Sequence, residues 1–215
     1  MTQIAWVMFA TAIAAGAVDW IAVAHANLRL RRVSKPATIL LLVGVALALH
    51  PASNQQRFVF VAALLLCLAG DIALLKDDHW FRVGLAAFLV GHLTYAAGFL
   101  VGGLDRGRLG YSLLGVALVS LGLGGWIARS ILGSDRRSMA LPVAGYLLAI
   151  SAMVALAIAS GKPAAIAGAA LFYASDGMIA WNRFVRPLPW SPVPVIVTYH
   201  LAQAGLVLSL VQQAA

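Results

Sequence analysis

The chain has 215 residues, of which 62% are hydrophobic and 10% are charged, and its formal net charge is +8. Soluble domains contain roughly 45–50% apolar and about 25% charged residues, so a soluble fold of this size is excluded. In a soluble chain such a charge would suggest a nucleic-acid partner. Here the basic residues cluster in short links between apolar segments, a pattern that indicates membrane topology and no nucleic acid.

Eight apolar segments follow one another along the chain, and most approach the roughly 20 residues that a helix needs to cross a bilayer core. We therefore predict an all-α, polytopic transmembrane bundle of about eight spanning helices, forming a single domain over residues 1–215. Short links require consecutive helices to run antiparallel. The predicted spans are Ile4 to Ala26, Ala37 to His50, Phe58 to Leu75, Phe81 to Val101, Leu109 to Leu132, Met139 to Ser160, Pro163 to Phe184, and Val193 to Val211.

The links carry the signal for orientation. Eleven of the 15 Lys and Arg residues fall in the first, third, fifth and seventh links, the first of which contains Arg29, Arg31, Arg32 and Lys35. Five of the six Trp residues lie at the same boundary. Basic links are typical of the cytoplasmic side and Trp is typical of a membrane interface, so we expect a multi-pass protein of a bacterial inner membrane with both termini non-cytoplasmic.

Three of the seven Asp residues, namely Asp19, Asp71 and Asp176, lie inside predicted spans. A charged side chain at the centre of a bilayer costs roughly 2.5–3.5 kcal/mol on insertion scales, which makes such residues candidates for function. The alternative is a buried Asp that caps a neighbouring helix or pairs with Lys35. That structural role is favoured for Asp19, which lies in no recognisable motif.

Chain direction predicts which polar residues share a depth, because late positions of odd helices and early positions of even helices lie on one side of the membrane. Asp71 and Asp176 share that side with a set of polar residues, and three more lie near or just beyond mid-depth. These residues are predicted to line a cavity that opens to the cytoplasmic leaflet. The first set is Asp19, Lys35, Tyr146, Asn182 and Tyr199; the second is His92, Gln203 and Tyr95.

A weak internal repeat relates the two halves of the chain. Asp71 and Asp176 lie in similar short motifs 105 residues apart, and His92-Leu93 and His200-Leu201 are 108 residues apart. A duplicated four-helix unit, in a 4+4 arrangement, would place the two Asp residues at equivalent positions. Chance similarity between helices rich in Ala and Leu is the alternative.

Metal and cofactor motifs are sparse. The sequence has no H-x-x-x-H cluster, P-loop or dinucleotide glycine motif, so we predict neither a metal nor a cofactor. A three-ligand metal site of His92, His200 and an Asp is the remaining alternative, and it requires the fold to bring them together. The single Cys67 excludes an intrachain disulfide.

Ordered motifs along nearly the whole chain resemble the lysoplasmalogenase (YhhN-like) family of multi-helix membrane proteins. They are Lys35-Pro36-Ala-Thr, LAGDIALL around Asp71, FRVGLAAFLVGHLTYAAGF, LPVAGYLLAISAMVALAIA, LFYASDGMIAWNRF around Asp176, and TYHLAQAGL. The resemblance implies a hydrolase that cleaves the vinyl ether bond of a lysophospholipid, the lysoplasmalogen, to a fatty aldehyde and a glycerophospho-choline or glycerophospho-ethanolamine.

The implied chemistry suits two carboxylates, because one protonates the β-carbon of the vinyl ether while the other stabilises the resulting oxocarbenium ion and activates water. We predict Asp71 and Asp176 as this pair, without deciding which is the acid. The other predicted site residues bind the substrate: hydrogen bonds come from the tyrosines and Gln203, and Lys35 or Arg183 receives the phosphate. The predicted binding residues are Lys35, His92, Tyr95, Tyr146, Asn182, Arg183, Tyr199 and Gln203.

Two other functions fit a membrane protein with buried Asp residues. Intramembrane aspartyl proteases also use two aspartates, but theirs lie on adjacent helices, whereas these lie on the third and seventh. A small transporter or lipid-binding protein is the second alternative, in which a buried Asp moves protons and no aldehyde is released.

Overall fold

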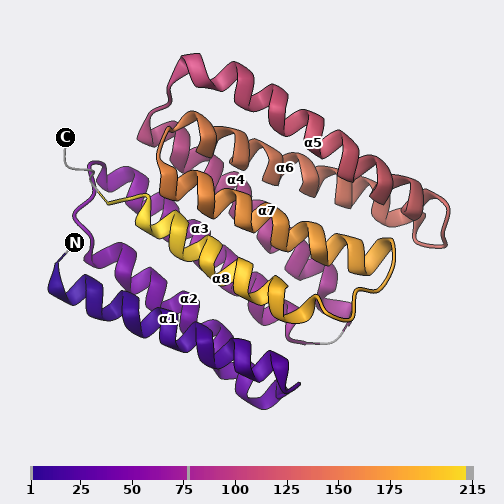
Figure 1. Cartoon of the computed structure of the whole chain (residues 1–215), viewed down its shortest axis with the longest axis horizontal. Helices are drawn as coiled ribbons and strands as arrows, with labels where there is room; N and C mark the ends of the chain where they lie inside the picture. The colour runs from indigo at the N-terminus through magenta and orange to yellow at the C-terminus, as the bar shows by residue number, and fades with distance from the viewer. Residues whose placement is uncertain (1, 77, 212–215) are drawn as a thin grey trace.

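Eight long α-helices form the chain in the computed structural model, which describes residues 2–76 and 78–211 (Figure 1). This confirms the predicted all-α class. Two short 3-10 helices, Asp78–Trp80 and Arg137–Met139, precede the fourth and sixth long helices. The long helices are α1 Gln3–Ala24, α2 Leu28–Ala48, α3 Asn54–Leu74, α4 Phe81–Gly102, α5 Arg106–Leu132, α6 Ala140–Ala159, α7 Pro163–Phe184 and α8 Pro192–Leu208.

Local sequence signals set where several helices begin. The side chains of Thr2, Ser53 and Asp105 accept hydrogen bonds from backbone N–H groups in the first turns of α1, α3 and α5. These N-caps satisfy donors that have no partner within the helix. Helices α7 and α8 begin with Pro163 and Pro192, a residue suited to the first helical position because its missing N–H is not needed there.

The first link is shorter than the sequence predicted, because α2 begins at Leu28 and not near Ala37. Asn27 caps this helix, with its side-chain oxygen accepting from the Leu30 amide at 3.1 Å. Pro36 lies inside the helix, nine residues from its start. The predicted link residues Arg31 and Lys35 are therefore one helical turn apart on a single face of α2, a placement that matters for the site below.

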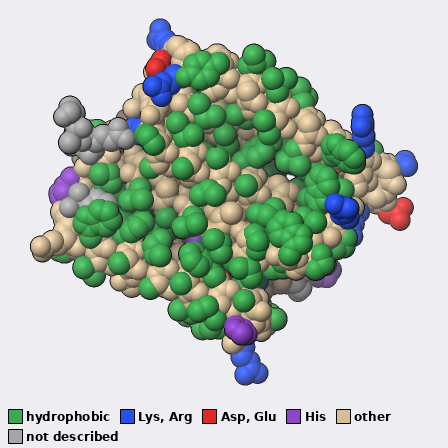
Figure 2. Space-filling view, in the orientation of Figure 1, with side chains coloured by type: hydrophobic (Ala, Val, Ile, Leu, Met, Phe, Trp, Pro, Cys, Tyr) green, Lys and Arg blue, Asp and Glu red, His purple; other side chains and the backbone are tan. Residues whose placement is uncertain are grey.

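Six of the eight helices are long and apolar enough to cross a membrane, by length and composition. The other two are α2, which carries four basic residues among its first eight, and α8, which has 17 residues. The surface agrees with immersion in lipid: Figure 2 shows a face covered with hydrophobic side chains, with Lys, Arg and Asp confined to its edges. The protein is therefore a multi-pass membrane protein.

Consecutive helices pack as antiparallel pairs, α1 with α2, α3 with α4, α5 with α6 and α7 with α8 (Figure 1). The α7/α8 pair is close because Gly168 faces Gly205 across the interface, and a Cβ on Gly168 would lie 2.8 Å from the Ala202 carbonyl oxygen. Small residues at such a crossing allow two backbones to approach in a membrane bundle. This close crossing fixes α7, which carries Asp176, against α8, which carries Tyr199.

All odd-numbered helices end, and all even-numbered ones begin, at the same end of the bundle, on the right in Figure 1. We call this the rim end. Both chain termini lie toward the opposite end, on the left of the figure. Asp19 and Asp71 are near the rim ends of their helices, and Asp176 lies in the half of α7 toward the rim end.

Candidate active site

A cavity of about 770 Å³ opens inside the bundle, lined by residues of every long helix except α1. This volume lies within the range of roughly 300–1,000 Å³ that is usual for ligand pockets. Its walls are mainly apolar, with a limited set of polar residues. The ionisable and hydrogen-bonding residues on its walls are Arg31, Lys35, Asp71, Ser120, Tyr146, Tyr173, Ser175, Asp176, Asn182, Arg183, Ser191 and Tyr199.

Asp71, on α3, is fully buried and held by two helices. Its Oδ1 lies 2.8 Å from Lys35 Nζ of α2, an ion pair in which the lysine side chain is 9% exposed. Its Oδ2 accepts a hydrogen bond from the Tyr199 hydroxyl of α8 at 2.7 Å. Both carboxylate oxygens of Asp71 therefore have partners, and Lys35 supplies the countercharge that a buried carboxylate needs.

A row of hydrogen bonds continues from this carboxylate away from the cavity. Gln203 Nε2 donates to the Tyr199 hydroxyl at 3.3 Å, and the Tyr95 hydroxyl donates to Gln203 Oε1 at 2.6 Å. Tyr95 and Gln203 are fully buried and do not line the cavity. The sequence predicted that both bind substrate; the structure places them behind Tyr199, where Gln203 donates to the Tyr199 hydroxyl and Tyr95 donates to Gln203.

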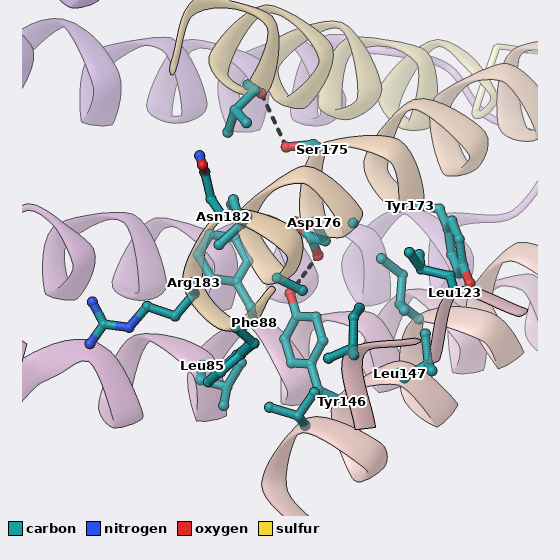
Figure 3. A pocket seen from close by; sticks show the side chains of 18 of the residues that line it. Leu85, Phe88, Leu123, Tyr146, Leu147, Tyr173, Ser175, Asp176, Asn182 and Arg183 are labelled. Carbon is teal, nitrogen blue, oxygen red and sulfur yellow. Dashed lines mark hydrogen bonds between the residues drawn. The ribbon is translucent and has the colours of Figure 1, made fainter. Parts of the chain in front are cut away.

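Asp176, on α7, has different neighbours. The Tyr146 hydroxyl donates to its Oδ2 at 2.5 Å, and His92 Nε2 lies 3.1 Å from the same oxygen and 2.9 Å from the hydroxyl. Figure 3 shows Tyr146 and Asp176 pointing toward one another. The Asp176 side chain is 11% exposed, and its Oδ1 has no hydrogen-bond partner within the described part of the chain, which leaves that oxygen to the cavity.

An aromatic contact joins the two carboxylate clusters. The ring of Phe172 on α7 lies 4.6 Å from the His92 ring and 5.4 Å from the Tyr199 ring, centroid to centroid. His92 bonds Asp176 and Tyr199 bonds Asp71, so the Phe172 ring lies between one partner of each aspartate. Both aspartates line the same cavity.

The remaining predicted residues lie toward the rim end. The Asn182 side chain donates to Ser191 and accepts from the Leu188 amide, which ties α7 to the start of α8. The guanidinium carbon of Arg183 lies 4.5 Å above the Phe81 ring. In Figure 3 the Arg183 side chain extends away from Asp176, so it lies at the edge of the cavity and not beside the carboxylates.

His92 and His200 do not form the alternative metal site. The Nδ1 atom of His200 accepts from Trp20 Nε1 at 3.1 Å, whereas His92 bonds Tyr146 and Asp176. Within residues 2–76 and 78–211, no group of three His, Cys or Asp side chains is placed to hold a metal ion.

Two cavity features escaped prediction from the sequence. Arg31 was placed in a link, yet it lines the cavity. Ser120 of α5 also lines it and bonds Ser151 at 2.8 Å and the Tyr173 hydroxyl at 2.9 Å, which adds a small polar cluster on the otherwise apolar wall. Arg31 was missed because α2 begins earlier than hydropathy predicts, and Ser120 because only the packing of α5 against α6 and α7 brings this serine to the cavity.

Comparisons with known proteins agree with the pattern of motifs. The YhhN family matches residues 30–210. Human lysoplasmalogenase TMEM86B is 33% identical over 171 residues, which cover 80% of this chain and 71% of the human protein. A lysoplasmalogenase of Mycobacterium tuberculosis is 34% identical over 176 residues, which cover 78% of this chain and 65% of that protein. Human lysoplasmalogenase TMEM86A is 29% identical over 184 residues, which cover 76% of this chain and 68% of that protein. No solved structure matches the chain.

Proposed function

The chain belongs to the YhhN family, and on that premise we propose that it is a lysoplasmalogenase, which hydrolyses the vinyl ether bond of a lysoplasmalogen within the membrane. The products are a fatty aldehyde and a glycerophospho-choline or glycerophospho-ethanolamine. One observation carries the mechanism: Asp71 and Asp176 line the same largely apolar cavity, and each is held by a different set of partners.

These partners divide the roles between the carboxylates. Asp71 makes an ion pair with Lys35, so we assign it the negative charge that stabilises the oxocarbenium ion. Among the residues that the structure describes, the Asp176 carboxylate bonds only the Tyr146 hydroxyl and His92 Nε2, both through Oδ2, and Asp176 lines the cavity. We therefore assign Asp176 as the proton donor, with the transferable proton on Oδ1 and with Oδ2 accepting from Tyr146 and His92.

In the proposed reaction, Asp176 first donates a proton to the substrate and later takes one back from water. Asp176 gives its proton to the β-carbon, which forms a C–H bond and leaves an oxocarbenium ion on the α-carbon beside the ether oxygen. Water then adds to the α-carbon while Asp176 takes back one of its protons, giving a hemiacetal. Transfer of the hemiacetal hydroxyl proton to the glycerol oxygen breaks the C–O bond and releases the aldehyde and the glycerophospholipid head.

The cavity fits the shape of such a substrate. The apolar walls contributed by α5 and α6 suit an alkenyl chain, while Asn182 and Arg183 lie where the polar head would reach the rim end. We propose that this end faces the cytoplasm, because most of the basic residues lie there. Substrate then enters from the cytoplasmic leaflet with its head group at the rim.

An aldehyde-release assay on purified protein in detergent tests the proposal. A lysoplasmenyl-ethanolamine substrate is compared with lysolipids of equal chain length that carry a saturated ether or an ester. We expect aldehyde from the vinyl ether lipid alone. If aldehyde does not form at any mole fraction of the vinyl ether lipid in the micelles, the hydrolase assignment fails and the transporter alternative gains support.

A further inference from the structure

Arg31 occupies a position that the proposed chemistry does not use. It lies on α2, one helical turn before Lys35, and both residues line the cavity. Lys35 is already paired with Asp71, whereas the guanidinium of Arg31 donates no hydrogen bond to any described residue. The Arg31 side chain is 29% exposed, so it is reachable from the polar end of the cavity.

Asp19 is the acidic residue paired with this arginine. Asp19, on α1, is fully buried, does not line the cavity, and accepts a hydrogen bond from the Ser34 hydroxyl at 2.8 Å. Its Oδ1 lies 3.9 Å from Arg31 Nε, close enough for attraction between the charges but beyond hydrogen-bond distance. Asp19 therefore attracts the guanidinium without occupying its donors.

We propose that Arg31 is the subsite for the phosphodiester of the lysolipid head group and that Asp19 is its positioning residue. A guanidinium presents paired N–H donors that match two oxygens of a phosphate, which a lysine cannot do. The subsite lies at the rim end of the cavity, so the phosphate would lie at the membrane interface while the vinyl ether reaches the aspartates. This inference rests on the proposed function and assigns the phosphate to Arg31, where the sequence alone had suggested Lys35 or Arg183.

The test compares two substrates that differ only in the phosphodiester head: a lysoplasmenyl-ethanolamine and the matching 1-alkenyl-glycerol, both as mole fractions in mixed micelles. Arg31→Gln should raise KM roughly ten-fold or more for the phospholipid, since hydrogen bonds to charged groups contribute about 1.5–3 kcal/mol, and should leave kcat within about two-fold. KM for the alkenyl-glycerol should not change. Arg31→Lys should recover part of the loss. Equal KM changes for both substrates would overturn the proposal.

A double substitution separates this role from a merely structural one. If Arg31 only neutralised the buried Asp19, removing both charges in Asp19→Asn/Arg31→Gln would restore the wild-type KM. Our proposal expects KM to stay raised in the double variant. Asp19→Asn alone should raise KM for the phospholipid by a smaller factor than Arg31→Gln. The matched control is Arg29→Gln, an exposed arginine of the same helix outside the cavity, which should leave both constants unchanged.

The affinity for a lysolipid with a saturated ether tests the head-group subsite independently of the hydrolase assignment. That lipid has the same head group and no vinyl ether, so its affinity can be measured whether or not the protein shows turnover. Arg31→Gln should weaken its binding roughly ten-fold, and equimolar inorganic phosphate should not displace it. Unchanged affinity in Arg31→Gln, or displacement by inorganic phosphate, would sink the head-group subsite even if aldehyde release is observed.

Discussion

At the scale of residues, the two aspartates differ in burial and in partners, because Asp71 is fully buried whereas the Asp176 side chain is 11% exposed. Asp71 is held by a cation and a tyrosine, and Asp176 by a tyrosine and a histidine. The sequence indicated both aspartates, because ionisable residues inside apolar segments are rare. It did not indicate their partners, since the contacts join positions 84 and 128 residues apart that no local pattern relates.

Replacing either aspartate by asparagine should abolish most turnover, because the amide keeps the size of the side chain but cannot exchange a proton or carry the charge. We expect kcat to fall by about 10²–10⁴ in Asp176→Asn and by at least roughly 10² in Asp71→Asn. The double variant should be little worse than the worse single one if the two act together. Aldehyde release measures this, with the exposed Asp135→Asn as control. Near-normal turnover in a folded variant would remove that aspartate from the mechanism.

Lys35→Gln should affect the chemical step more than substrate binding, because its partner is Asp71. A buried carboxylate left without its counterion costs about 3–5 kcal/mol of stability, so this variant should also unfold at a lower temperature in detergent. Adding Asp71→Asn should restore the unfolding temperature without restoring turnover. A Lys35→Gln protein with a raised KM and unchanged kcat would return Lys35 to the head-group role.

At the scale of elements, the helix boundaries followed hydropathy closely except at α2. Hydropathy marks where a helix meets the lipid, whereas a helix can continue beyond the lipid, as α2 does from its cap at Asn27. The sequence therefore placed Arg31 in a link. The eight helices and the order of their pairs were predictable, because segment lengths and short links constrain them.

The packing also gives the predicted duplication a structural counterpart. Asp71 on α3 is contacted from α2 and α8, and Asp176 on α7 is contacted from α6 and α4. If α5 to α8 repeat α1 to α4, then α6 corresponds to α2 and α4 corresponds to α8, so each aspartate is contacted by one helix of its own half and one helix of the other half. We propose that the two carboxylate clusters descend from one repeated unit whose partners later diverged.

Gly168→Val tests whether the close α7/α8 crossing supports the site. A Cβ at this position would meet backbone atoms of α8 at 2.8 Å, and backbone cannot move aside as a flexible side chain can. We expect a loss of about 1–3 kcal/mol of stability, seen as a lower unfolding temperature in detergent, together with reduced kcat. Gly115→Val on α5 is the control, because nothing lies within 4 Å of that position. Equal stability of the two variants would contradict the role assigned to this crossing.

At the scale of the whole molecule, the face shown in Figure 2 is largely apolar, and the Lys, Arg and Asp side chains visible there lie at its edges. Composition predicted this arrangement, because so few charged residues must be placed where water is. The position of the cavity was less predictable. Its walls come from seven helices, α2 to α8, so no single segment of sequence specifies where it lies.

Labelling of introduced cysteines in intact cells tests the proposed orientation. In a Cys67→Ser background, Asp135→Cys places a thiol in the loop between α5 and α6 at the rim end, and Ala52→Cys places one between α2 and α3 at the other end. A membrane-impermeant maleimide should label Ala52→Cys at once and Asp135→Cys only after permeabilisation. The reverse pattern would put the rim outside.

The amide of Gln203 has a consequence for the movement of protons through the bundle. The hydrogen bonds from Tyr95 through Gln203 and Tyr199 to Asp71 all point the same way, with the carboxylate as the final acceptor. A row of hydroxyl groups or water molecules can hand protons along, but a carboxamide receives a hydrogen bond on its oxygen and donates from its nitrogen, two atoms that do not share a proton. Gln203 therefore interrupts proton transfer along this row of hydrogen bonds. We propose that protons are exchanged with the substrate at the cavity and that Gln203 keeps them from passing along the hydrogen bonds behind Asp71.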